Sequence, residues 1–129
     1  MSAATAIASY ARASSATASP SELVRMAYER VLTACDRATN ADLDRPANWV
    51  QTFHDEMLRA QAILVELTAG LAIDHEDPSV RAMARELGEL YRFAIDGLIE
   101  ANVGKHSAPL RGVRMVIDRL RDAWVRKAS

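Results

Sequence analysis

Apolar residues recur along most of the chain at intervals of three and four positions, which is the spacing of one face of an α-helix. In residues 47–70 the two intervals alternate over the whole segment. Such alternation is typical of a seam that packs against neighbouring helices with a left-handed crossing, so a helix is predicted here. The seam consists of Val50, Phe53, Met57, Ala60, Leu64, Leu67 and Leu71.

Three more segments repeat this periodicity, and two of them begin with a clear start signal. Ser19 and Pro20, with Glu22 after them, form a capping box with proline at the first helical position, which predicts a helix over 20–39. Asp77 and Pro78 give the same kind of start for a helix that runs to residue 103.

The remaining boundaries follow from loop residues. Gly104 is predicted to end the third helix in a left-handed conformation. Ser107 and Pro109 open a fourth helix that runs to about residue 127. Residues 40–46 read as a loop, and residues 72–77 as a short acidic turn. Long helices joined by short loops predict an all-α fold, an antiparallel up-down four-helix bundle over residues 19–129.

Residues 1–18 differ from the rest because they are small and weakly polar. Their large apolar groups are Ile7 and Tyr10, three positions apart, which would share one face of a helix. Alone, the segment buries too little to fold. We expect a flexible tail, or a short N-terminal cap that borrows a surface from the bundle.

Composition narrows the class of protein. Of 129 residues, 50% are hydrophobic and 26% charged, and the net charge of −1 disfavours a nucleic-acid binder. No apolar run is long enough to insert in a membrane, and residues 1–18 lack the features of a secretory signal. The single Cys35 suits a reducing compartment, so a cytoplasmic protein is expected.

The residues that could carry chemistry do not form a recognisable constellation. Neither His54, His75 nor His106 follows a Glu at the spacing that di-iron bundles use, and no seam position is acidic. Cys35 lies on the inner face of the first helix, where a small core residue is expected. We therefore expect no metal, no cofactor and no enzymatic activity, with all three histidines at the surface.

The third helix carries more apolar residues than one buried face requires. Met83, Leu90 and Phe93 extend its seam on one side, and Ile95 and Ile99 on the other. The apolar arc spans about 240°, against about 100° for a helix with one buried face. Either this helix is central or lies in a homodimer interface, or it offers a hydrophobic groove to a partner helix, which the N-terminal tail could cover until a client displaces it.

Three groups of residues resemble the FliS family of flagellar secretion chaperones, over roughly residues 7–125. The first group is Tyr10, Thr17-Ala18-Ser19-Pro20, Leu23-Val24, Met26 and Tyr28. The middle group is Leu71, Asp74, Glu76, Leu87-Gly88-Glu89-Leu90-Tyr91, Leu98 and Ala101-Asn102. The last group is Leu120-Arg121-Asp122-Ala123-Trp124.

The resemblance implies a non-enzymatic chaperone with a four-helix bundle and an N-terminal cap. Such a chaperone would bind the disordered C-terminal segment of flagellin in the cytoplasm, prevent premature polymerisation, and help deliver flagellin to the flagellar type III export gate. Ile7 and Tyr10 would belong to the displaceable cap and the export surface. The alternative is a helical regulatory or dimerisation module. The residues expected to contact a partner are Ile7, Tyr10, Met83, Leu90, Phe93, Ile95 and Ile99.

Overall fold

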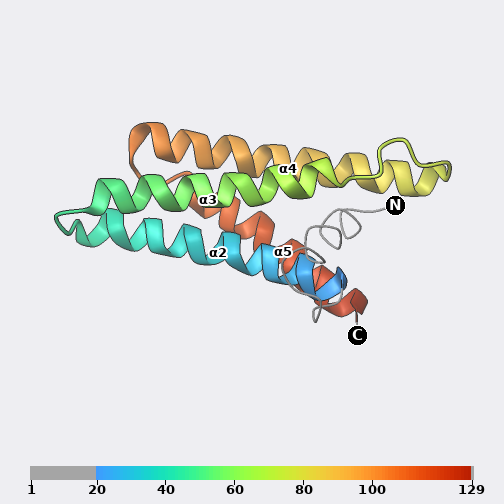
Figure 1. Cartoon of the computed structure of the whole chain (residues 1–129), viewed down its shortest axis with the longest axis horizontal. Coiled ribbons are helices and arrows are strands. Elements are labelled where there is room, and N and C mark those ends of the chain that lie inside the picture. The colour runs from blue at the N-terminus through green and yellow to red at the C-terminus, as the bar shows by residue number, and fades with distance from the viewer. Residues whose placement is uncertain (1–19, 129) are drawn as a thin grey trace.

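The computed structural model describes residues 20–128, which form four α-helices joined by short loops. The helices are α2 (Pro20–Asp44), α3 (Trp49–Ala69), α4 (Pro78–Gly104) and α5 (Leu110–Ala128). Successive helices run in opposite directions (Figure 1). The predicted all-α, antiparallel up-down four-helix bundle is therefore confirmed.

The helices form a closed ring in which each packs against two others, in the order α2, α3, α4, α5 and back to α2. α5 runs obliquely to α4, and the turn between α3 and α4 projects beyond the start of α2 and the end of α5 (Figure 1). The early turns of α4 therefore have fewer neighbours than its later turns. None of the helices within residues 20–128 is long and apolar enough to cross a membrane.

The seams predicted for the helices fill the core. Fully buried large side chains come from all four helices: Val24, Tyr28, Val31, Phe53, Met57, Leu64, Leu67, Tyr91, Leu98, Leu110, Val113 and Ile117. Alanines lie between them at Ala34, Ala38, Ala60, Ala94 and Ala101. The two ends of the predicted α3 seam differ, since Val50 is exposed and Leu71 is half-buried at the periphery of the core.

The first helix continues through residues 40–44, where a loop was expected. Tertiary contacts explain the extension. Ala41 is buried, and the Asp42 carboxylate accepts a hydrogen bond of 2.8 Å from the backbone N–H of Ser107, in the loop before α5. The chain turns at Arg45, whose φ of 46° lies in the left-handed region.

The expectation for the end of α4 is also corrected. Gly104 is the last residue of the helix, and the left-handed residue is Lys105, with a φ of 49°. The ammonium group of Lys105 donates to the backbone and side-chain oxygens of Asn102 at 2.6 and 2.7 Å, which secures this turn. A Cβ at position 104 would meet the ring of the exposed His106, so a larger residue there would require that side chain to move.

The expected start signals have different outcomes. Asp77 precedes α4 and its carboxylate accepts a hydrogen bond of 2.8 Å from the backbone N–H of Ser79, as an N-cap residue does. Pro20 begins α2 as predicted, whereas Ser19 lies outside the described residues.

Two tyrosines meet in the middle of the bundle, across the diagonal between α2 and α4. The hydroxyl oxygens of Tyr28 and Tyr91 are 2.6 Å apart, and both side chains are fully buried. Burial raises the pKa of both phenols, so both hydroxyls stay neutral. Each hydroxyl therefore satisfies the other in a core that is otherwise apolar at this level.

We expect Tyr28→Phe and Tyr91→Phe each to lower the free energy of unfolding by about 1–3 kcal/mol, the cost of a buried polar group left without a partner. The double variant should lose less than the sum of the two, because neither hydroxyl then remains. Urea denaturation followed by circular dichroism measures all three variants. Strictly additive losses would show that the hydroxyls do not depend on one another.

Candidate functional site

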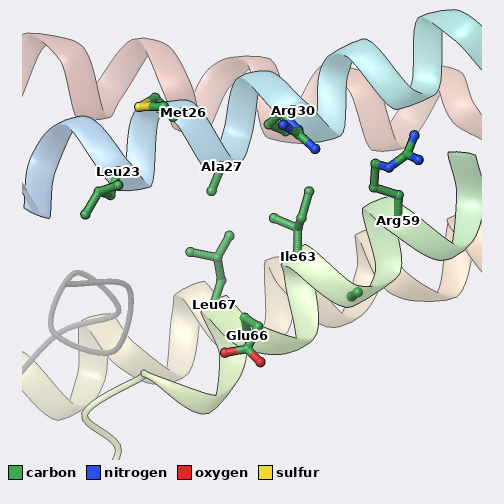
Figure 2. A pocket seen from close by; sticks show the side chains of 9 residues that line it. Leu23, Met26, Ala27, Arg30, Arg59, Ile63, Glu66 and Leu67 are labelled. Atoms are coloured by element: carbon green, nitrogen blue, oxygen red, sulfur yellow. The ribbon is translucent and has the colours of Figure 1, made fainter. Parts of the chain in front are cut away.

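A groove of about 490 Å³ runs along the outer side of the contact between α2 and α3 (Figure 2). Its walls come from both helices, and most of its lining is aliphatic. The lining residues are Leu23, Met26, Ala27, Arg30, Arg59, Ala62, Ile63, Glu66 and Leu67. In Figure 2 the side chains of Ile63 and Leu67 point from α3 into the space below α2.

Helical spacing explains why these residues share one groove. The α2 residues fall at positions i, i+3, i+4 and i+7 from Leu23, and the α3 residues at i, i+3, i+4, i+7 and i+8 from Arg59. They form a strip beside the buried seam of each helix. Ala27 and Ala62 have short side chains, so the strip stays hollow where two larger residues would fill it.

Charged groups sit at the two ends of the groove. Arg30 of α2 and Arg59 of α3 lie at one end, and Glu66 of α3 lies beside Leu67 toward the other (Figure 2). Because α2 and α3 are antiparallel, the later turns of the α2 strip lie beside the earlier turns of the α3 strip. Arg30 and Arg59 therefore meet at the same end of the groove, which we call the positive end.

A buried carboxylate holds the positive end in place. Glu56 is only 4% exposed, and it pairs with Arg59 one turn later on α3. Its other oxygen lies 3.8 Å from an Arg37 guanidinium nitrogen on α2. The burial of Glu56 was not predicted from the sequence, because Glu56 lies next to the seam residue Met57, at a position that is solvent-facing when α3 is considered alone.

The apolar residues expected to bind a partner on α4 are largely uncovered. Met83, Leu90, Phe93 and Ile99 are exposed, with Phe93 the most exposed at 52%, whereas Ile95 is half-buried against the core.

These residues do not form one surface. Phe93 faces α5, since a Cβ added at Gly112 would lie 3.3 Å from its ring. Met83 and Leu90, at ten and three positions before Phe93, lie on the same flank of α4. Ile95 and Ile99 lie on the opposite flank, toward α3. The predicted residues are therefore divided between two neighbouring helix–helix contacts of the ring, α4–α5 and α3–α4, which we call the α4–α5 and α3–α4 seams.

The α3 flank contains two apolar residues that sequence analysis missed. The Asn102 side-chain nitrogen lies 3.1 Å from His54 Nδ1, which fixes the register of α4 against α3. This register places Leu58 about level with Ile99, and Val65 follows two turns later along α3; Leu58 and Val65 are about half exposed. His54 and His75 are half-buried, although the surface was expected for both.

The N-terminal residues of the predicted set, Ile7 and Tyr10, lie outside the described residues. The groove between α2 and α3 was also missed, since Leu23 and Met26 were identified only as motif residues of the family resemblance. In the sequence, the groove is indicated by two apolar residues, Met26 and Ile63, which lie just beside the core-facing residues of their helices. That signal gains meaning only when the two helices are known to be neighbours.

The described residues offer little to reaction chemistry. Between residues 20 and 128 no group of three or more His, Cys, Asp or Glu side chains could hold a metal ion. Burial, with the nearby Asp36 carboxylate, raises the pKa of the Cys35 thiol to about 12, so this thiol is not a nucleophile near neutral pH. The arrangement is suited to binding apolar surface.

A comparison with known protein families identifies the family to which the chain belongs. The family described as flagellar protein FliS matches residues 3–128, essentially its whole length. The chain therefore belongs to the FliS family, and the resemblance seen in its motifs is confirmed. A comparison with curated proteins finds no match. Membership of this family implies a flagellar export chaperone.

Proposed function

We propose that this FliS-family protein is a cytoplasmic chaperone that binds the disordered C-terminal segment of flagellin. By covering that segment it prevents premature polymerisation, and it helps to deliver flagellin to the flagellar type III export gate. It does so by binding alone, without catalysis. The observation that carries the proposal is a bundle with a filled core that still leaves large apolar side chains uncovered on α3 and α4, in a chain of this family.

The energetics of such a client favour an apolar surface. A disordered segment loses conformational entropy when it folds on a partner, and the loss is offset mainly by burial of apolar area. The groove between α2 and α3 and the two flanks of α4 supply that area. The net charge of −1 gives little long-range attraction, so contact area has to dominate.

The distribution of these surfaces supports an extended client. The groove lies on the α2–α3 seam, Ile99 and Leu58 lie on the α3–α4 seam, and Leu90 and Phe93 lie on the α4–α5 seam. These are three consecutive seams of the ring. One straight helix cannot cover them all, whereas a segment that forms short helices joined by turns can wrap around the bundle.

We further propose that residues 1–18 form the displaceable cap, with Ile7 and Tyr10 as its apolar anchors. The connection to the bundle supports this role. Residue 18 is two positions before α2 begins at Pro20, and Leu23 of the groove follows within the first turn. The tail is thus tethered beside the surface that it would cover.

A homodimer is the alternative use of the same side chains. Leu58, Val65 and Ile99 could meet a second copy of the chain across the α3–α4 seam. Light scattering across a concentration series separates the two proposals. A stable dimer that no longer binds flagellin would favour the regulatory or dimerisation module.

We expect Leu90→Asp to weaken binding of a flagellin C-terminal peptide by about 30-fold or more, the effect of losing a central apolar contact. Leu90 is 38% exposed, so the bundle should keep its fold. Isothermal titration calorimetry measures the affinity, and circular dichroism checks the helix content. Val103→Asp is the matched control, because Val103 is 82% exposed on the same helix. Wild-type affinity in Leu90→Asp would remove this flank from the binding surface.

We expect hydrogen exchange in residues 4–18 to change when the flagellin peptide is added. A tail that covers the client surface is released on binding, so its amides should exchange faster in the complex. Mass spectrometry with peptide-level resolution makes the measurement, and Ile7→Ser with Tyr10→Ser serves as the variant that lacks both anchors. Identical exchange with and without the client would contradict a displaceable cap.

A further inference from the structure

We infer that the α2–α3 groove selects the direction of the helix that docks in it. The docked helix lies parallel to α2, with its carboxyl end and an acidic residue of its last turn beside Arg30 and Arg59. This inference rests on the proposed function, since the occupant is a short amphipathic helix of the flagellin C-terminal segment. The inference specifies the orientation of that helix in the groove and the charged residues that determine this orientation.

Charge is distributed unevenly along the groove. Arg30 and Arg59 lie at one end of an otherwise aliphatic lining, and Glu66 lies toward the other. Arg59 and Glu66 are seven residues apart on α3, which is about 10 Å along the helix. An occupant of two to three turns therefore meets cations at one end, while the Glu66 carboxylate lies at the rim near the other end, on the side of α3 turned away from α2 (Figure 2).

The positive end of the groove is only partly neutralised by the residues that the structure describes. Arg30 is exposed and makes no ion pair with any residue that the structure describes. Arg59 pairs with Glu56, which Arg37 of α2 also approaches at 3.8 Å, so Arg30 is the guanidinium of the groove lining that has no carboxylate partner among residues 20–128. Arg59 is already fixed by its bond to Glu56, which reduces the entropy lost when it binds an acidic partner.

Any helix that docks in the groove has an electrostatic polarity of its own. A helix carries partial negative charge at its carboxyl end and partial positive charge at its amino end. The carboxyl end is favoured beside Arg30 and Arg59, and the amino end beside Glu66. Because α2 runs from Leu23 toward Arg30, this arrangement makes the docked helix parallel to α2 and antiparallel to α3.

Two designed peptides of equal apolar content test the direction. Both form amphipathic helices of about three turns, one with Glu in its last turn and Lys in its first, the other with these charges exchanged. Calorimetry of wild-type protein should show the first binding about three- to tenfold more tightly, as expected for exposed charge pairs and helix-end interactions. The ratio should shrink at high salt because these charges are screened.

Arg30→Glu should reduce the ratio to about two or less. Arg30→Gln, which has the same length as Arg30→Glu and removes the positive charge without adding a negative one, should give an intermediate ratio. Arg92→Glu is the matched control: Arg92 is exposed on α4, outside the groove, and should leave the ratio unchanged. Circular dichroism of each variant confirms that the bundle is folded.

Equal affinity of the two peptides for the wild-type protein, or failure of both to bind, would overturn the inference. So would an unchanged ratio in Arg30→Glu. Binding of the full flagellin C-terminal segment is measured in parallel. If that segment does not bind while the peptides keep their preference, the proposed client is wrong and the polarity of the groove stands. If the segment binds and the peptides show no preference, only the inference fails.

Discussion

Alanine at the helix contacts controls how closely the four helices of this bundle approach one another. Ala38, Ala60, Ala94 and Ala101 are completely buried between larger residues. Since the distance between packed helices depends on the side chains at their contact, short side chains draw the axes together and narrow the core. A narrow core is filled by one seam from each helix, and large side chains beside the seams, such as Ile63, Leu90 and Phe93, are left at its edge.

The apolar surplus at the surface is therefore a consequence of how the interior is packed. A folded protein without a bound partner is expected to expose few large apolar patches, because such patches promote association. In this chain the exposed residues are spread over three seams, so each patch stays small. Several small patches can bind one extended client together, while each alone is a poor site for nonspecific contact.

The sequence predicted the features that depend on one helix at a time. Periodicity gave the number of helices and nearly all of the core, and Asp77 with Pro78 marked the start of α4. It misplaced features that depend on contacts between helices. Residues 40–44 remain helical because Asp42 binds the backbone of Ser107, and Glu56 is buried because two arginines from different helices reach it. The groove belongs to this second group, since it exists only where the strips of α2 and α3 face each other.

Burial of Glu56 links the core to the charges of the groove. A buried carboxylate without a partner would lower the stability of the fold. Glu56 is instead paired with Arg59 of α3, and Arg37 approaches it from α2. Arg59 thereby sits at a fixed place on the rim. In the proposed complex, apolar area supplies the affinity of the groove for a helix, and the arginines contribute a small free-energy difference between the two orientations of that helix. A modest free-energy difference suffices for this purpose, because it has only to rank two ways of burying the same apolar face.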